Sequence, residues 1–326
     1  MRVLLHTGGE VLGIACDDEH LASVLEEGAD GRLALYDESV VTVSVVVERD
    51  RGPFATDGWS TLARDAWHRD GAVVVRDVCT SGLDLHARVV DGIPILTFRR
   101  RPPARTRAAG TVLPARARLL MRCVLLQYPA LWWAGTRERV PLHASLLRTC
   151  GHDVVVGGPS GVGKSTLVAA EVAGGATAAG DNLCVTDGRV TWGIVEPMRI
   201  EGGDGRRMPH GRRECHLAGR VPALVPDVVA LLRRGVEGRS EAVALDSRSA
   251  GRQLAAGTYT AGELRRFWPF AALLALGTGA GPVHPPVAAV SRVLADRAAA
   301  FEVVLGRGPA GRLTRLVTRE EEVVSA

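Results

Sequence analysis

Gly158-Pro159-Ser160-Gly161-Val162-Gly163-Lys164-Ser165 is the stretch that decides the fold of this 326-residue chain. It matches the phosphate-binding pattern G-x-x-x-x-G-K-[ST], the P-loop, at every fixed position. A short apolar run at 154–156 precedes it, and a helix-forming segment beginning at Thr166 follows it. Because the motif needs a strand before it and a helix after it, the sequence predicts an α/β domain built around this loop.

The residue types in this loop suit a nucleoside triphosphate with Mg²⁺. Glycines let backbone N–H groups turn toward phosphate oxygens, and the start of the helix adds its positive dipole end. Lys164, the only lysine in the chain, is expected to reach the terminal phosphates. The Ser165 hydroxyl is expected to ligate Mg²⁺. We therefore predict ATP and Mg²⁺ as cofactors, held by residues 158–166; a Gly-rich turn without a ligand is the simpler alternative.

The composition excludes several classes of protein. The chain is 46% hydrophobic and 23% charged. Its 40 basic residues are mixed with 36 acidic ones, which gives a net charge of only +4, so we expect no nucleic-acid partner. No stretch of 18 apolar residues and no signal peptide is visible, so we expect no membrane partner and a cytoplasmic location. Six scattered cysteines without a C-x-x-C pair argue against zinc and against a disulfide scaffold.

Two domains are predicted from the distribution of turn signals. Residues 1–108 alternate short β-type runs with Asp-Gly and Gly-Gly turns, which indicates a smaller, mostly antiparallel, β-rich α+β domain with helices at 19–27 and 61–68. Five arginines and two prolines in residues 99–107 suggest the boundary, with an anion-binding arm as the alternative. Residues 109–326 form the P-loop domain, with helices expected at 113–133, 227–234, 261–276 and 286–300.

The expected path of the chain brings two residues, His143 and Asp181, close to the phosphate loop. If 140–147 and 153–157 form a tight hairpin around Cys150 and Gly151, His143 comes opposite 157–158. The helix after the loop should end at the glycines 174–175, roughly 16 Å away at 1.5 Å per residue. A strand over 176–181 would then bring Asp181 back to Lys164, and a hairpin turning at 187–188 should follow.

These features together resemble the HPr kinase/phosphorylase family. The likeness rests on His143, on the loop itself and on Gly180-Asp181-Asn182, and covers roughly residues 138–200. It is closer to the HPr-kinase-related enzymes of bacterial natural-product clusters, such as lasso-peptide precursor kinases. The resemblance implies an ATP-dependent serine or hydroxyl kinase with an HPr kinase/PEP carboxykinase-like P-loop domain. The family usually carries two adjacent aspartates; here Asn182 can offer an oxygen to Mg²⁺ but cannot be a general base.

The expected catalytic residues are Lys164, Asp181 and His143, and the expected metal ligands are Ser165, Asp181 and Asn182. Asp181 or His143 would accept the proton of the attacking hydroxyl. Glu196 is a further candidate acid, and four arginines are candidates for clamping ATP or an acidic substrate: Arg206, Arg207, Arg212 and Arg213.

Two other function classes stay open. One is a motor or transport ATPase, for which Asp246 is the nearest Walker-B-like aspartate; the other is a non-catalytic ATP-binding module. The acceptor is expected to be a peptide serine or a small-molecule hydroxyl. The sequence does not decide whether the chain forms a homo-oligomer.

Overall fold

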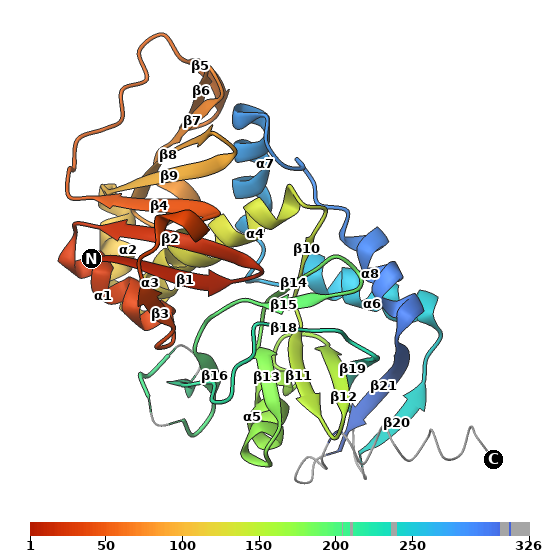
Figure 1. Ribbon diagram of the computed structural model, residues 1–326. Coiled ribbons are helices and arrows are strands. Elements are labelled where there is room, and N and C mark those ends of the chain that lie inside the picture. Colours follow the sequence, from red (N-terminus) through yellow and green to blue (C-terminus); the bar gives the residue numbers. More distant parts are fainter. Residues whose placement is uncertain (204, 209–210, 236–239, 307–312, 314–326) are drawn as a thin grey trace.

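Four β-sheets organise the computed structural model, which describes residues 1–203, 205–208, 211–235, 240–306 and 313 (Figure 1). A nine-stranded sheet is built from the first hundred residues, and a six-stranded sheet carries the phosphate loop. A four-stranded sheet occupies the middle of the view between them, and a two-stranded sheet lies beside it. The chain is therefore a mixed α/β protein with several sheets, as its sequence predicts.

The nine-stranded sheet has the order β3-β1-β2-β4-β9-β8-β7-β6-β5. Its strands are β1 (Arg2–Thr7), β2 (Glu10–Cys16), β3 (Leu33–Leu35), β4 (Val43–Glu48), β5 (Ser60–Ala63), β6 (Ala66–Arg69), β7 (Ala72–Val75), β8 (Leu83–Val90) and β9 (Ile93–Arg100). Only the β2–β4 and β4–β9 pairs are parallel, and the other pairs are antiparallel. The expectation of a mostly antiparallel sheet is confirmed.

Helices cover one face of this sheet and bury its apolar side chains. They are α1 (Glu19–Gly28), α3 (Pro114–Arg122), the π-helical turn η3 (Cys123–Gln127), α4 (Tyr128–Gly135) and α7 (Phe267–Thr278), while α2 (Ala104–Val112) packs on α3. Alternate residues of β4 enter the cluster, which gives the period of two expected for a half-buried strand. This apolar cluster also includes residues of α4 and α7, so the packing continues past residue 108. The division into domains at that residue stays a prediction.

The six-stranded sheet has the order β13-β11-β12-β19-β21-β20. Its strands are β11 (Ser145–Thr149), β12 (His152–Gly157), β13 (Thr177–Gly180), β19 (Val228–Arg234), β20 (Glu241–Ala244) and β21 (Ala299–Leu305). One face packs on α5 (Lys164–Ala173) and the other on α6 (Ser247–Tyr259) and α8 (Val287–Arg297). Along β19, Val228, Ala230 and Leu232 pack in the apolar cluster on the α5 side of the sheet. Val229 and Leu231 pack in the cluster on the side of α6 and α8.

Two of the three direct connections between the six-stranded sheet and the four-stranded one carry predicted site residues. The smaller sheet consists of β10 (Val140–Leu142), β14 (Cys184–Thr186), β15 (Thr191–Gly193) and β18 (Ala223–Leu224). The chain crosses between the sheets at residues 143–144, from β10 to β11, and at 181–183, from β13 to β14. The remaining sheet pairs β16 (Met198–Ile200) with β17 (Arg213–Cys215). The crossings place His143 and Asp181 where the two sheets meet.

Several predicted elements need correction. Residues 61–68, expected as a helix, lie in the β5–β6 hairpin, where Asp65 takes a left-handed turn conformation with φ +60°. The segment 227–234, also expected as a helix, is the buried strand β19, because a short apolar run fits either structure. The predicted helix at 261–276 begins only at Phe267. No element was expected at β2, β8 or α6.

The Gly- and Arg-rich segment 201–213 lies partly outside the described residues, and its last residue begins β17. Within the described part of the chain, no helix is both long and apolar enough to cross a membrane.

Candidate active site

The phosphate loop turns between β12, which ends at Gly157, and α5, which begins at Lys164. Gly158, Gly161 and Gly163 have φ values of +141°, +78° and +117°, which side chains other than hydrogen rarely allow. A Cβ atom on Gly158 would also lie 2.8 Å from the carbonyl oxygen of Leu232. The glycines are therefore required by the shape of the loop, as the motif predicts.

Lys164 is folded over this loop. Its Nζ donates hydrogen bonds to the carbonyl oxygens of Gly158 at 2.8 Å and Pro159 at 3.3 Å, and the residue is only 7% exposed. Burial lowers the pKa of its ammonium group, and the nearby carboxylates of Glu263 and Asp181 oppose that shift. An anionic ligand would favour the charged form further, which is what a phosphate-binding lysine needs.

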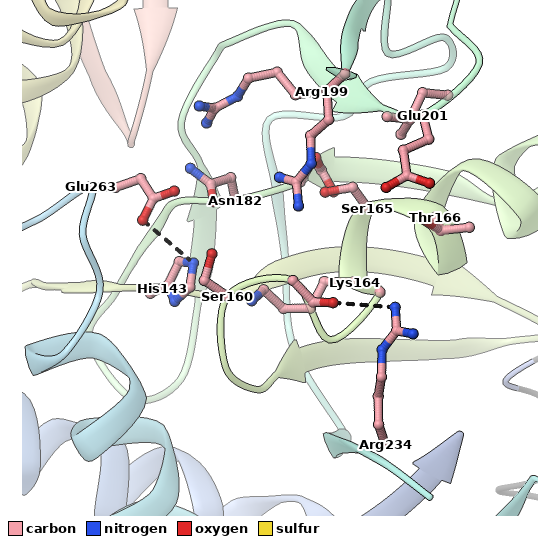
Figure 2. Close-up of a pocket in the computed structure, with 15 residues that line it drawn as sticks. His143, Ser160, Lys164, Ser165, Thr166, Asn182, Arg199, Glu201, Arg234 and Glu263 are labelled. Atoms are coloured by element: carbon pink, nitrogen blue, oxygen red, sulfur yellow. Dashed lines mark hydrogen bonds and ion pairs between the residues drawn. The ribbon is translucent and has the colours of Figure 1, made fainter. Parts of the chain in front are cut away.

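A polar cleft opens over the loop (Figure 2). Its walls include six of the nine predicted loop residues: Ser160, Gly161, Gly163, Lys164, Ser165 and Thr166. Of the other three, Gly158 and Pro159 accept the lysine's hydrogen bonds, and Val162 is buried in the apolar cluster beside Leu167. These three residues shape and anchor the loop without lining the cleft.

His143 reaches the cleft because of the hairpin register. Strand β11 pairs with β12 through Thr149 opposite His152 and Ser145 opposite Val156, so continuing this register sets His143 opposite Gly158. The predicted hairpin around Cys150 and Gly151 is confirmed. The backbone N–H of His143 donates to Thr258 Oγ1 at 3.1 Å. Burial and the charge of Lys164 lower the pKa of the imidazole, so we expect it to be neutral at pH 7.

Asp181 follows strand β13, which returns from α5 as predicted and pairs with β11. The residue is 3% exposed, and burial raises the pKa of its carboxyl group to about 6. The charge of Glu196 acts in the same direction, whereas a hydrogen bond from Ser165 and the charges of Arg199 and Lys164 oppose it. A buried carboxylate whose charge is incompletely compensated is well suited to a cation.

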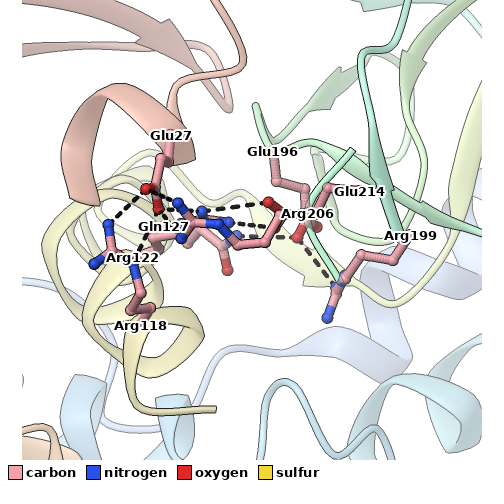
Figure 3. Close-up of polar contacts among 8 residues, drawn as sticks. All are labelled: Glu27, Arg118, Arg122, Gln127, Glu196, Arg199, Arg206 and Glu214. Atoms are coloured by element: carbon pink, nitrogen blue, oxygen red, sulfur yellow. Dashed lines mark hydrogen bonds and ion pairs between the residues drawn. The ribbon is translucent and has the colours of Figure 1, made fainter. Parts of the chain in front are cut away.

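Asn182, which lines the cleft in Figure 2, connects it to a buried polar layer around Glu196, drawn in Figure 3. Its Nδ2 donates to Glu196 at 3.2 Å, which leaves the amide oxygen as its acceptor. Glu196 also accepts hydrogen bonds from Gln127 and Arg199, each at 3.2 Å, and is 6% exposed. Glu196 does not line the cleft; it supports Asn182 and Arg199 from behind.

Sequence reasoning missed several residues that line the cleft. Glu263, in the segment before α7, lies 4.0 Å from His143 Nε2 and is part of the wall, as Figure 2 shows. Arg234, at the end of β19, donates to the Gly161 carbonyl oxygen at 3.3 Å. A further part of the wall comes from the end of β16 and the residue after it: Arg199, Ile200 and Glu201. No motif in the sequence marks these positions, because three separate segments contribute them.

The predicted arginine clamp is mostly elsewhere. Of the four arginines predicted to form it, Arg212 alone lines the cleft. Arg206 binds the carboxylate of Glu27 on α1, at 2.6 Å from Nη1, and Arg213 donates to the Gly205 carbonyl oxygen. Asp246, the Walker-B-like candidate, caps the N-terminus of α6 by accepting from the Ser249 N–H group, and it does not line the cleft.

Arg206 belongs to an ion cluster that joins α1 and α3 to the segment between β16 and β17 (Figure 3). Glu27 accepts hydrogen bonds from Arg118 and Arg122 of α3 as well as from Arg206. Arg122 also pairs with Glu214 of β17. We call these residues the Glu27 cluster. It connects the strand pair β16–β17 to α1, and β16 in turn contributes part of the cleft wall.

The oxygens around the cleft fit Mg²⁺ only in company with phosphates. Ser165, Asp181 and Asn182 offer a hydroxyl, a carboxylate and an amide oxygen, the hard ligands that Mg²⁺ prefers. Among the described residues there is no group of three or more His, Cys, Asp or Glu side chains that could hold a metal by itself. Protein-bound Mg²⁺ commonly uses one or two carboxylates together with water and substrate phosphates, so this set is sufficient.

Comparison of the sequence with protein-family models and with curated proteins gives no match. Among solved structures, the HPr(Ser) kinase/phosphatase from Coxiella burnetii superposes with a TM-score of 0.29 and 12% sequence identity. The superposition covers 57% of this chain and 92% of that one. A score this low does not support the transfer of an activity, so the function has to be inferred from the site's own residues.

Proposed function

We propose that this chain is an ATP-dependent phosphotransferase that moves the γ-phosphate of ATP to a hydroxyl group. One observation carries the proposal: a buried carboxylate and a buried imidazole lie at the same sheet edge as a complete phosphate loop. A loop that only binds nucleotide needs neither group. Phosphoryl transfer to a hydroxyl needs a positioned oxygen nucleophile and an acceptor for its proton.

In this proposal, each residue has a role that follows from its position. Lys164 and the backbone N–H groups of the loop hold the β- and γ-phosphates. Ser165 and Asp181, with the Asn182 oxygen, would hold Mg²⁺, which would neutralise charge on the transferred group. The hydroxyl oxygen bonds to the γ-phosphorus as the bond to the bridging oxygen breaks, and ADP leaves. The hydroxyl proton passes to Asp181 or to neutral His143.

The protonation states support these roles. The pKa of Asp181 near 6 leaves its carboxylate ionised at neutral pH, the form that can hold a cation. The lowered pKa of His143 keeps the imidazole neutral, so it could accept the hydroxyl proton. Glu263 near His143 Nε2 would stabilise the imidazolium formed by such a transfer.

The proposed acceptor is a serine of a peptide, with a small-molecule hydroxyl as the alternative. The resemblance of residues 138–200 to kinases of natural-product clusters favours the peptide. A non-catalytic ATP-binding module is the second candidate function, because Asn182 stands where the related kinases carry a second aspartate.

Radiolabelled γ-phosphate separates these possibilities. The protein is incubated with labelled ATP, Mg²⁺ and either a serine-containing peptide library or a set of small hydroxyl compounds. We expect label in an acceptor and a fall of roughly 10²-fold or more for Lys164→Ala, with an unchanged melting temperature. ATP hydrolysis without a labelled acceptor would favour an ATPase. Tight ATP binding without either product would favour the binding module, and undiminished transfer by Lys164→Ala would refute the site.

A further inference from the structure

Helix α2 (Ala104–Val112) lies on the outside of the molecule with little to hold it in place. None of its residues is buried, and its main helix contact is with α3. Figure 1 shows it at the side of the molecule that carries the N-terminus. Thr106 donates to Asp77 at 2.8 Å, and Val112 beyond it is 76% exposed. Isolated helices of this length are only marginally stable in water, so a bound partner would stabilise α2.

A cavity of about 720 Å³ lies between α2, α3 and the end of β9. Its charged walls are arginines from three parts of the chain, and no Asp or Glu among the described residues lines it. These arginines are Arg100, Arg105, Arg107, Arg116, Arg118 and Arg266. Between them, apolar walls come from Leu113, Leu120 and Met121. We call this space the α2–α3 cavity.

Most of these guanidinium groups lack a strong counter-charge. Arg118 is paired with Glu27, but Arg105 reaches Asp77 only at 3.9 Å and is 76% exposed. Arg107 donates to a carbonyl oxygen at 3.4 Å. Within the described ranges, the side chains of Arg100, Arg116 and Arg266 form no hydrogen bond or ion pair. Several like charges around one cavity repel one another and are stabilised by an anion.

We propose that the α2–α3 cavity binds a peptide segment that carries carboxylate side chains next to apolar ones. Carboxylates match the guanidinium forks, and the walls at Leu113, Leu120 and Met121 match an apolar side chain. Inorganic phosphate would use only the arginines. Single-stranded nucleic acid stacks its bases on aromatic side chains, and in the part of the chain that the structure describes no Trp, Tyr or Phe lines this cavity.

This site is distinct from the phosphate loop and does not rest on phosphoryl transfer. It assigns a role to the arginine-rich segment 99–107, for which the sequence suggested either a domain boundary or an anion-binding arm. The segment continues as the end of β9 and the start of α2, and three of its five arginines, Arg100, Arg105 and Arg107, line the cavity.

The test begins with a display library of random dodecapeptides selected on the full-length protein. We expect the selected peptides to be enriched in Asp and Glu together with Leu, Ile or Val. The tightest of them, labelled with fluorescein, is then titrated by fluorescence anisotropy. Arg105→Gln/Arg116→Gln, which changes one arginine on each helix, should weaken binding by roughly 10-fold or more.

Matched controls keep this test specific. Arg248→Gln/Arg252→Gln removes the same charge from exposed positions on α6 and should bind the peptide as the unchanged protein does. Lys164→Ala should also bind it normally, whatever the outcome of the transfer assay. An unchanged melting temperature for the cavity variant, Arg105→Gln/Arg116→Gln, would show that α2 and α3 still fold.

Several results would overturn the proposal. One is a selection without acidic enrichment, and another is equal peptide binding by the cavity variant and the unchanged protein. Tighter arginine-dependent binding of phosphatidylglycerol vesicles or of oligo(dT) than of any selected peptide would assign the cavity to a membrane or to nucleic acid. Displacement of the peptide by low millimolar inorganic phosphate, lost in the same variant, would indicate a site for small anions only.

Discussion

Glu27 is expected to stabilise the fold more than any solvent-facing carboxylate nearby, because three arginines converge on it. Arg118 and Arg122 come from α3 and Arg206 from the segment between β16 and β17. Arg122 is almost fully buried, with 4% of its side chain exposed. Glu27→Gln removes the charge, and of the three arginines only Arg122 keeps a carboxylate partner among the described residues, Glu214.

The size of the effect follows from the pKa of Glu27. Burial alone would raise this pKa, but the hydrogen bonds from the three arginines outweigh burial and lower it from 4.5 to about 2. At about 1.36 kcal/mol per unit, such a shift corresponds to about 3 kcal/mol of stability. Because the Arg206 side chain is 40% exposed, solvent screens part of it, and we expect a loss of about 2 kcal/mol at pH 7.

The pH dependence of this loss has a definite sign. A carboxyl group with a depressed pKa in the folded state stabilises the fold above its unfolded pKa, and that contribution disappears as pH falls through the folded pKa. The difference between the unchanged protein and Glu27→Gln should therefore be constant from about pH 8 to about pH 5.5. It should narrow below about pH 4.5 and vanish near pH 2.

Urea denaturation followed by tryptophan fluorescence measures this difference. The matched control is Glu26→Gln, which changes an exposed neighbour in the same helical turn and should cost less than about 0.5 kcal/mol. Because the Glu27 cluster holds the segment beside β16, the KM for the acceptor should also rise in Glu27→Gln more than in Glu26→Gln. Equal losses of stability in the two variants, or a gap that stays constant down to pH 3, would refute the reasoning.

Two further predictions concern the cleft. Asp181→Asn should abolish transfer yet raise the free energy of unfolding at pH 8 by up to about 3 kcal/mol, because a pKa raised to about 6 destabilises the fold as pH rises from 3.8 to 6. Urea denaturation at pH 8 and pH 4 checks this, and a variant less stable than the unchanged protein at pH 8 would contradict it. Gly158→Ala should abolish ATP binding in calorimetry and destabilise by about 2 kcal/mol or more, because its Cβ would meet the Leu232 carbonyl oxygen. Gly161→Ala, with no atom within 4 Å, should cost only about 1 kcal/mol; equal losses in the two variants would show that the contact with Leu232 is unimportant.

The sequence by itself determined the parts of this protein that local rules govern. The phosphate loop, the hairpin around Cys150 and Gly151, and the return of the chain to Asp181 all lie within one continuous stretch. Turn length, strand rise and helix rise are nearly constant, so spacing along such a stretch predicts position in space. The same rules failed at 61–68 and 227–234, where a short run of residues suits a strand as well as a helix.

Only the tertiary structure decided which distant residues surround this loop. Glu263 reaches His143, Arg234 reaches Gly161, and the Glu27 cluster joins α1 to the segment before β17. These contacts depend on how helices and sheets pack, and that packing depends on the sum of many apolar contacts across the chain. No local pattern marks a residue whose partner lies a hundred positions away. The sequence therefore located the loop and the two residues that return to it, and the fold supplied the other residues that line the cleft.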